Sequence, residues 1–283
     1  MNGTSLDKRQ VRVAFDRAAE SYDQAASLQR VVADRLLERL DQIKVVPRTI
    51  LDAGAGTGYC LPLLRKRYGC EVIALDIAPG MLRKAQHRGR WFSRAQCLCA
   101  DIERLPLASA TMDLVVSNLT LQWCDTGVAF RELGRILASG GLLLFSTFGP
   151  DTLKEVRTAW SGVDDQAHVH DFADMHDLGD DLIRVGLGDP VLDVDRITVR
   201  YRATRDIITD LKRLGAHNAR KGRFSGLTGK HRFRLFEERL AALAEADGRI
   251  PVTFEVVYGH AWAQTPSPAG ASSTPVRWLG RTP

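Results

Sequence analysis

The stretch ILDAGAGTGY, residues 50–59, decides how the chain folds. The apolar residues of a short strand lead to Asp52, and Gly54, Gly56 and Gly58 follow at alternate positions. A strand that runs into a glycine-rich turn and then a helix brings backbone N–H groups and a helix N-terminus close to a ligand. Glycine lets a ligand approach the backbone without meeting a Cβ atom. The stretch therefore predicts a ligand-binding turn at the end of a strand.

The spacing of these glycines indicates which kind of ligand fits. A dinucleotide fingerprint has its third glycine three residues after the second, where it seats a pyrophosphate. Here the glycines alternate, and Asp52 precedes them. A carboxylate in that place would repel a pyrophosphate but would suit a cationic ligand. At this point, the alternative that the glycines only form a turn stays open.

Strand and helix patterns alternate on the C-terminal side of the turn. Short apolar stretches predict strands, and amphipathic stretches between them predict helices. This alternation is typical of a parallel sheet covered by helices on both faces, so the sequence predicts a doubly wound α/β fold. Strands are expected at 48–53, 70–76, 95–101, 112–118, 141–148, 189–202 and 251–264, and helices at 59–68, 79–88, 128–137 and 176–187.

The remaining segments define the expected domain organisation. Residues 1–47 have helical periodicity and are expected to form an N-terminal lid. A single α/β domain is expected over 48–264, with a helical, basic insertion at about 203–250. The small, proline-rich tail at 265–283 is expected to be disordered.

The composition of the chain bounds the classes of protein that it can belong to. With 283 residues and 45% hydrophobic residues it can bury a full core. No window approaches the roughly 18 apolar residues of a membrane helix, and no signal peptide is evident, so we expect a cytoplasmic protein without membrane contact. The five cysteines lack zinc-site spacing, so they are expected to be reduced and mostly buried, with no metal site.

Two more acidic residues end the next two predicted strands. Asp76 closes VIALD about eighteen residues after Gly58, where a carboxylate can bind both hydroxyls of a ribose. Asp101 closes CLCAD and adds another acceptor at the carboxyl edge of the sheet, where ligands of such sheets bind. A single Asp after a strand is often a helix cap. Three in register, Asp52, Asp76 and Asp101, are more consistent with a binding site.

This set of motifs resembles the class I S-adenosylmethionine-dependent methyltransferases. The motifs lie within about 48–148 and read LDAGAGTG, ALDIAPGML, ADIERLPL, MDLVVSNLTLQW and ELGRILASGGLLLFST. The resemblance implies a seven-stranded, mostly parallel sheet with an antiparallel last strand, and S-adenosyl-L-methionine as the cofactor. It implies that the glycine turn carries the methionine part, that Asp76 holds the ribose, and that Asp101 with Ile102 reads the adenine. The expected cofactor-binding residues are Asp52, Ala53, Gly54, Gly56, Gly58, Asp76, Ile77, Asp101, Ile102, Asn118 and Leu119.

Three residues are candidates for catalytic residues close to the transferred methyl group. Gln122 and Trp123 follow the fourth strand, where an acceptor would meet the methyl group. Trp123 has the equally acceptable role of packing a helix onto the sheet. The family resemblance also suggests that Tyr22 closes over the methionine end of the cofactor, with helix packing as the alternative.

Three further stretches resemble the malonyl-[acyl-carrier-protein] O-methyltransferases of biotin synthesis. They are FDRAAESYDQAASLQR, DFADMHDLGDDLIRVGLGDPVLDVD and LKRLGAHNARKGRFSGLTGK, and the resemblance covers about 10–262. It implies that the free carboxylate of a malonyl thioester is esterified on an acyl carrier protein. Such a carboxylate is ionised at neutral pH, so its attack needs no general base.

Residues 196–239 hold thirteen Lys or Arg against four Asp or Glu, whereas the whole chain has a net charge of +5. This excess is either a solvated face or a docking surface for an acidic partner, and acyl carrier proteins are acidic. Within it, Arg220 and Arg223 are candidates for binding the substrate carboxylate or a phosphate of the carrier's prosthetic arm.

Other functions stay open on the sequence alone. A methyltransferase for a small carboxylate such as aconitate shares the LQW context but would have no use for the basic insertion. An RNA methyltransferase would use that insertion, but aromatic residues for base stacking are sparse there, which makes a nucleic-acid partner the weaker interpretation. The last alternative is an assembly protein that binds the cofactor without turnover.

Overall fold

The computed structural model describes residues 6–88, 95–164, 166, 168, 169, 171–213 and 229–264, except for the side chains of 212 and 213. The sequence interpretations of Arg220, Arg223 and the tail at 265–283 lie outside the described residues. In the described part, no helix is long and apolar enough to cross a membrane.

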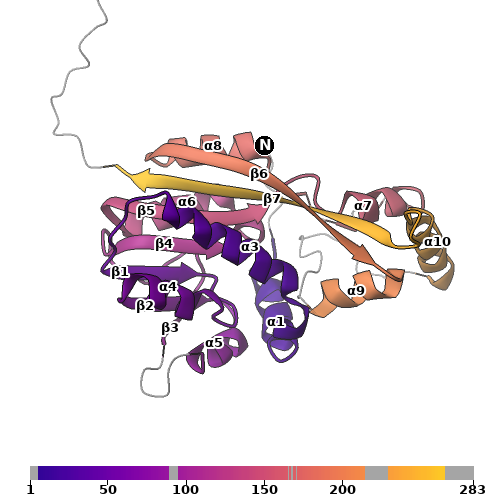
Figure 1. Ribbon diagram of the computed structural model, residues 1–283, viewed down its shortest axis with the longest axis horizontal. Coiled ribbons are helices and arrows are strands. Elements are labelled where there is room, and N and C mark those ends of the chain that lie inside the picture. The colour runs from indigo at the N-terminus through magenta and orange to yellow at the C-terminus, as the bar shows by residue number, and fades with distance from the viewer. Residues whose placement is uncertain are drawn as a thin grey trace, which may run out of the picture.

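Seven strands form one sheet in the order β3-β2-β1-β4-β5-β7-β6 (Figure 1). Strands β1 to β5 pair in parallel, and β7 is antiparallel to both β5 and β6. The predicted doubly wound, mostly parallel sheet with an antiparallel last strand is confirmed. The strand bounds are β1 Thr49–Ala53, β2 Glu71–Asp76, β3 Gln96–Cys99, β4 Met112–Asn118, β5 Leu137–Phe148, β6 Leu187–Tyr201 and β7 Ile250–Ala263.

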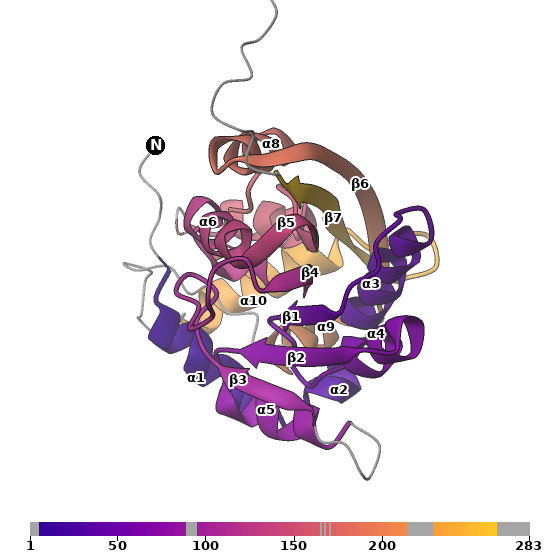
Figure 2. The same ribbon diagram turned by 90° about the vertical axis from the view of Figure 1, so that its left-hand side faces the viewer.

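Successive residues of a strand point to opposite faces of the sheet. Both faces of this sheet are apolar, so helices pack on both of them and form two apolar clusters. In β1, Ile50 contributes to one cluster, whereas Leu51 and Ala53 contribute to the other. Helices α3 and α4 pack in the first cluster and α6 and α8 in the second, and Figure 2 shows α3 and α4 on one side of the sheet and α6 on the other. The bounds are α3 Ser27–Glu38, α4 Cys60–Tyr68, α5 Pro79–Gln86, α6 Thr126–Ile136 and α8 Met175–Arg184.

Local sequence sets the ends of several helices. The Asp125 side chain caps α6 by accepting a hydrogen bond from the Val128 N–H at 3.0 Å. At the other end of α4, Gly69 adopts a left-handed conformation with φ of 67°, which glycine tolerates best. These signals explain why the helix positions could be predicted to within a few residues.

The N-terminal segment divides between the core and the carboxyl edge of the sheet. Helix α3 belongs to the core, because Val32 and Leu36 are fully buried in it. Helices α1 (Lys8–Ala18) and α2 (Tyr22–Ala25) instead stand beyond the ends of the parallel strands (Figure 1). In the described part of the chain, these two helices are therefore placed to cover a ligand there.

Strands β6 and β7 extend beyond the rest of the sheet. The pairing of β7 with β5 ends at Val256, whereas its pairing with β6 continues to Ile250. Three helices surround this two-stranded extension (Figure 1). They are α7 Lys154–Ser161, α9 Thr204–Arg213 and α10 Lys230–Ala241.

The cysteines are less buried than expected. Cys60 is buried, but Cys70, Cys97 and Cys124 are half-buried and Cys99 is exposed. Cys97 and Cys99 lie on β3, which is an edge strand of the sheet. The prediction of mostly buried thiols was wrong because the sequence did not reveal which strand would be at the edge.

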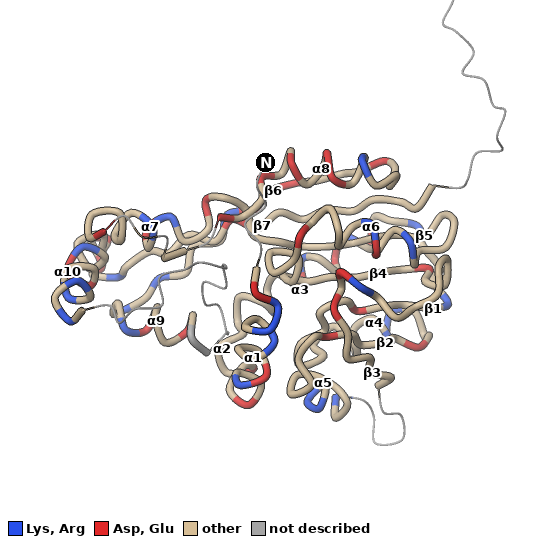
Figure 3. Tube along the Cα trace, turned by 180° about the vertical axis from the view of Figure 1, so that it is seen from behind, with Lys and Arg blue, Asp and Glu red and all other residues tan. Residues whose placement is uncertain are grey.

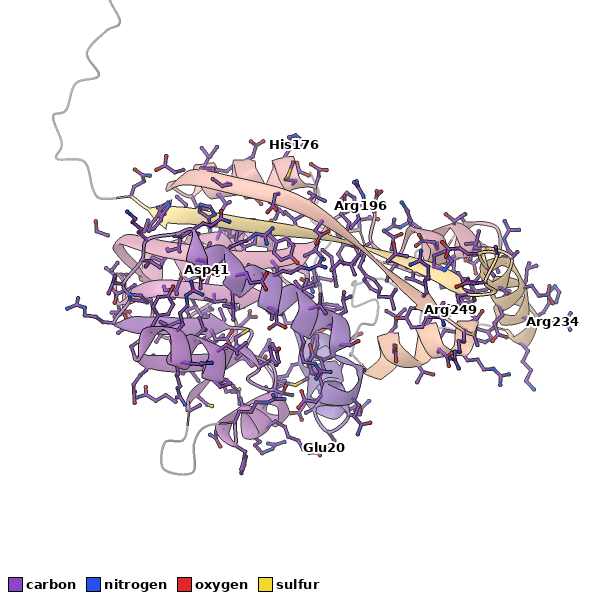
Figure 4. The ribbon with its side chains drawn as sticks, viewed as in Figure 1. Glu20, Asp41, His176, Arg196, Arg234 and Arg249 are labelled. Carbon is purple, nitrogen blue, oxygen red and sulfur yellow. The ribbon has the colours of Figure 1, made fainter. Side chains whose placement is uncertain are left out.

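Glu255 of β7 ties the extension to the body of the sheet. Its side chain is buried, and Oε2 accepts a hydrogen bond from the Asp151 N–H at 2.8 Å. Oε1 accepts another from Arg196 Nη2 at 3.0 Å. Figure 4 places Arg196 where β6 and β7 leave the body. Glu255 thus fixes the turn after β5 to the base of the extension.

Replacing Glu255 with Ala should lower the free energy of unfolding by about 2–4 kcal/mol, because it leaves a buried N–H and a charge without their acceptor. Urea denaturation measures the change. Arg196→Gln is the control, and since the Arg196 side chain is 60% exposed it should cost less than about 1 kcal/mol. If both variants lower the free energy of unfolding equally, the buried Glu255 carboxylate is not the main source of the stabilisation.

Candidate active site

A pocket of about 590 Å³, its open mouth included, lies at the carboxyl ends of the parallel strands and beneath α1. Its size is in the range of small-molecule binding sites. Most of the predicted site residues meet here, although they are distant in the sequence. Those lining the pocket are Tyr22, Gly54, Gly56, Asp76, Ile77, Asp101, Ile102, Asn118, Leu119 and Trp123.

The three glycines of the turn have different surroundings, although all three have φ between 53° and 84°. A Cβ atom on Gly54 would lie 2.2 Å from Thr120 Oγ1, and one on Gly58 would lie 2.9 Å from the Cβ of Ala85. A Cβ atom on Gly56 would meet only Tyr22, at 4.0 Å. The bare backbone therefore faces the pocket at Gly56, whereas protein fills the space beside the other two.

Asp76 joins the turn to the end of β2. Its Oδ2 accepts a hydrogen bond from the Gly56 N–H at 2.9 Å, and its Oδ1 accepts one from the Ala78 N–H at 2.8 Å. Burial raises the pKa of Asp76 to about 6, although these backbone hydrogen bonds act in the opposite direction. The carboxylate thus lines the pocket and holds the glycine turn at the same time.

Asp52 lies behind the pocket wall and is 1% exposed. Among the described residues, its Oδ2 atom has no hydrogen-bond partner. Burial, and then the charge of Asp76, raise the pKa of Asp52 to about 7. Two buried carboxylates close together favour a ligand with positive charge, because a cation offsets their repulsion. The orphaned oxygen and the bare backbone at Gly56 therefore fit a cationic, amino-acid-bearing cofactor.

The end of β4 is held in a strained conformation. Leu119 has φ of 47°, which is unusual for a residue with a branched side chain. Its N–H donates to Ser146 Oγ at 3.0 Å, and Ser146 Oγ donates to Asn118 Oδ1 at 2.9 Å. Asn118 Nδ2 also donates to the carbonyl of Gln29 at 3.1 Å. These bonds fix the backbone of Asn118 and Leu119 where it lines the pocket.

Gln122 and Trp123 both have structural partners. Gln122 Nε2 donates to the Leu119 carbonyl at 2.7 Å, and Gln122 does not line the pocket. Trp123 lines the pocket and makes an edge-to-face contact with Phe15 of α1, with ring centroids 5.5 Å apart. The packing role left open for Trp123 is therefore what the structure shows, and it brings α1 over the pocket.

Helix α2 is tied to the glycine turn. Asp23 accepts a hydrogen bond from Thr57 Oγ1 at 2.7 Å and pairs with Arg88. Its neighbour Tyr22 lines the pocket beside Gly56. Burial, followed by the charge of Asp76, raises the pKa of Tyr22, so its hydroxyl stays protonated.

Lys8 is a pocket residue that the sequence analysis missed. Its Nζ lies 2.7 Å from Glu103 Oε1 and 3.3 Å from Asp101 Oδ1. Val11 and Phe15 line the pocket from the same face of α1. Lys8, Val11 and Phe15 are spaced three and four residues apart, which places them on one face of a helix. The sequence does not indicate what that face covers. Among the pocket residues that the structure describes, Lys8 is the cation closest to Asp101.

Two further predicted residues, Ala53 and Gly58, do not line the pocket. Ala53 is fully buried in the core beneath the turn, and Gly58 packs against α5. Arg220 and Arg223 lie outside the described residues.

Comparisons with known proteins agree with this geometry. A family model described as a methyltransferase domain matches residues 51–145. The malonyl-[acyl-carrier protein] O-methyltransferase of Halorhodospira halophila is 50% identical over 273 residues, which cover 95% of this chain and 92% of the relative. The protein of the same name from Gallionella capsiferriformans is 48% identical and covers 94% of both chains. The one from Legionella pneumophila is 38% identical over 89% of this chain and 90% of its own.

Solved structures share the fold at low sequence identity. The YcgJ protein of Bacillus subtilis has a TM-score of 0.58 and 17% identity, and the match covers 81% of this chain and 98% of that one. Geranyl diphosphate methyltransferase, solved in complex with S-adenosylmethionine, has a TM-score of 0.50 and 17% identity over 82% of this chain and 84% of its own. Likeness at this level of identity shows the fold.

The sheet order, the glycine turn, the acidic strand ends and the relatives named as methyltransferases define a class I S-adenosylmethionine-dependent methyltransferase, and S-adenosyl-L-methionine is its cofactor. Within that class, the chain belongs to the malonyl-[acyl-carrier protein] O-methyltransferase family. The resemblance found in the sequence is confirmed at both levels.

Gly56→Val should weaken cofactor binding at least about 100-fold, because the new side chain would occupy the pocket where the backbone is bare. Calorimetric titration with S-adenosylhomocysteine measures the affinity. Gly69→Val is the matched control, since Gly69 also has a positive φ, of 67°, but a Cβ there meets nothing within 4 Å. If Gly56→Val and Gly69→Val lose the same cofactor affinity, backbone strain rather than a side chain in the pocket explains the loss of affinity.

Without cofactor, the contribution of Asp52 to the free energy of unfolding should fall as the pH rises from about 4 to about 7. The pKa of Asp52 is about 7 in the folded state against an ordinary value of 3.8, so the folded state binds more protons in this window. The stabilisation present below pH 4 is lost as the pH passes the folded pKa. Asp52→Asn should remove roughly 1–3 kcal/mol of this dependence in urea titrations at several pH values. If the free energy of unfolding depends on pH in the same way for the variant and the wild type, the raised pKa of Asp52 is contradicted.

Proposed function

We propose that this protein transfers the methyl group of S-adenosyl-L-methionine to the free carboxylate of a malonyl thioester on an acyl carrier protein, an early step of biotin synthesis. The observation that carries the proposal is 48–50% identity, over more than nine-tenths of both chains, to proteins named for this reaction.

When bound, the cofactor supplies a methyl group made electrophilic by the attached sulfonium. An ionised malonyl carboxylate needs no general base, so the residues of this chain have to align the acceptor and exclude water. The Phe15 and Trp123 contact supports water exclusion, because it closes α1 over the pocket. The hydrogen bonds at Leu119 and Asn118 support alignment, because they fix the backbone at the end of β4.

The positions of the site residues support specific roles in holding the cofactor. The turn at Gly54 and Gly56, beside Tyr22, would hold the amino-acid end. Asp76 would accept the ribose hydroxyls, and Asp101 with the buried Ile102 would contact the adenine. Lys8 would orient the Asp101 carboxylate through their ion pair. In this arrangement α1 and α2 act as the lid over the site.

The basic segment supports an acidic partner, but only part of its charge is free. In Figure 4, Arg234 and Arg249 lie at the outer end of the extension, and both pair with neighbouring acids. Arg200, Arg205 and Arg232 also pair with acids. Five more cations of the segment, Lys212, Arg213, Arg220, Lys221 and Arg223, have side chains outside the described part of the chain.

A radiolabelled methyl-transfer assay tests the proposed function. Malonyl carrier protein, malonyl coenzyme A, aconitate and bulk tRNA are offered as acceptors with labelled cofactor. Base-labile label on the carrier protein supports a carboxyl ester at the expected position. Label only on aconitate or tRNA, or none despite tight cofactor binding, would overturn the proposal while leaving the fold and cofactor assignments intact.

Arg220→Glu with Arg223→Glu should lower kcat/KM for malonyl carrier protein at least about 10-fold, because it reverses two charges expected to meet the acidic substrate. Cofactor affinity should not change. The control is Arg234→Glu with Arg249→Glu, which makes the same change of net charge at residues that are already paired. Unchanged kinetics in the first variant would remove both arginines from the substrate site.

A further inference from the structure

Helix α1 has a second face, which points away from the pocket. Arg9, Arg12 and Arg17 are exposed on it, and Val13 among them is 40% exposed. Spacings of three to five residues bring these side chains to one side of a helix. They line a shallow surface hollow together with Asp16. We call this set the outer face of α1.

The outer face keeps its positive charge. Within the described part of the chain, none of its three arginines forms an ion pair or a side-chain hydrogen bond. Asp16 is the acidic residue of the face, and its Oδ1 already accepts a hydrogen bond from the Gly80 N–H at 2.5 Å. Its ion-pair contact is to Arg83 of α5, at 3.9 Å, which adds a further cation nearby.

This state differs from that of several arginines on the other basic helices. On α9 and α10, Arg205, Arg232 and Arg234 are each within 4 Å of a carboxylate oxygen. In Figure 3, α1 carries its blue positions beside the carboxyl end of the sheet, apart from α9 and α10. Among the described helices that border the pocket, α1 therefore presents free positive charge in a compact stripe around an apolar side chain.

We propose that the outer face of α1 is a docking surface for the acidic acyl carrier protein, an inference that rests on the proposed function. Its arginines would pair with carboxylates of the partner, and Val13 would give the contact an apolar centre inside a charged rim. The sequence interpretation had assigned docking to the basic insertion alone.

The position of this face suits delivery of a tethered substrate. Lys8, Val11 and Phe15 line the pocket from the opposite side of the same helix. A helix with its side chains is about 10–12 Å across, so a partner on the outer face lies only one helix away from the pocket. A flexible prosthetic arm then has a short path around α1 to the mouth of the site.

Arg9→Glu with Arg12→Glu tests the surface without disturbing the pocket. A Glu in the first turn of α1 agrees with the helix dipole, so the helix should still form, and circular dichroism checks that it does. The matched control is Lys44→Glu with Lys66→Glu, which reverses two exposed cations on segments that enter β1 and β2 at their amino ends.

The double variant of α1 should raise KM for malonyl carrier protein about 10- to 30-fold at low ionic strength. KM for malonyl pantetheine, which lacks the protein, and the affinity for S-adenosylhomocysteine should stay within about twofold. The difference should shrink as salt is raised from 0.01 M to 0.15 M, because the Debye length falls from about 30 Å to about 8 Å. The control variant should behave like the wild type.

Two further measurements separate this surface from the proposed function. If the wild type methylates the carrier protein but the α1 variant has an unchanged KM, or if the control loses as much, the docking surface is wrong and the function stands. Direct titration of the carrier protein by fluorescence anisotropy tests docking without turnover. Absence of both methylation and binding in the wild type overturns both proposals. A wild-type dimer in sedimentation that the α1 variant dissociates would make the face a self-association surface and overturn docking.

Discussion

The hydrogen bond from the Gly56 N–H to the Asp76 carboxylate is the constraint on which the site depends. It joins the turn after β1 to the end of β2, and the second carboxylate oxygen binds the Ala78 N–H at the start of α5. One side chain thus sets the positions of two loops and of the helix that follows. Because both loops line the same pocket, the shape of the cofactor site follows from this bond.

The same arrangement has an electrostatic cost that function explains. Asp52 and Asp76 are both buried, and their pKa values rise to about 7 and about 6. A fold selected only for stability would avoid an unpaired buried carboxylate oxygen. A site for a cationic cofactor benefits from it, since binding offsets the repulsion between the two groups. The strained Leu119 at the end of β4 belongs to the same pattern of local instability at a functional site.

Helix α1 connects this site to the outside of the molecule. Its inner face brings Lys8 to Asp101 and Glu103 and Phe15 to Trp123, so it closes the pocket through two ion pairs and one aromatic contact. Its outer face carries Arg9 and Arg12 within reach of a partner. The same helix therefore borders the cofactor pocket on one face and carries the proposed docking surface on the other.

The sequence by itself determined the order of strands and helices, the class of fold and most of the pocket lining, because periodicity, glycine spacing and acidic strand ends are local signals. It missed Lys8 and misjudged the exposure of Cys99, and it could not distinguish the open surroundings of Gly56 from the filled surroundings of Gly54 and Gly58. Only the tertiary structure decided which strand is at an edge, what α1 covers and which arginines find acids, because those outcomes depend on contacts between residues far apart in the chain. Local sequence patterns identified most residues of the site, whereas tertiary packing determined which residues they contact.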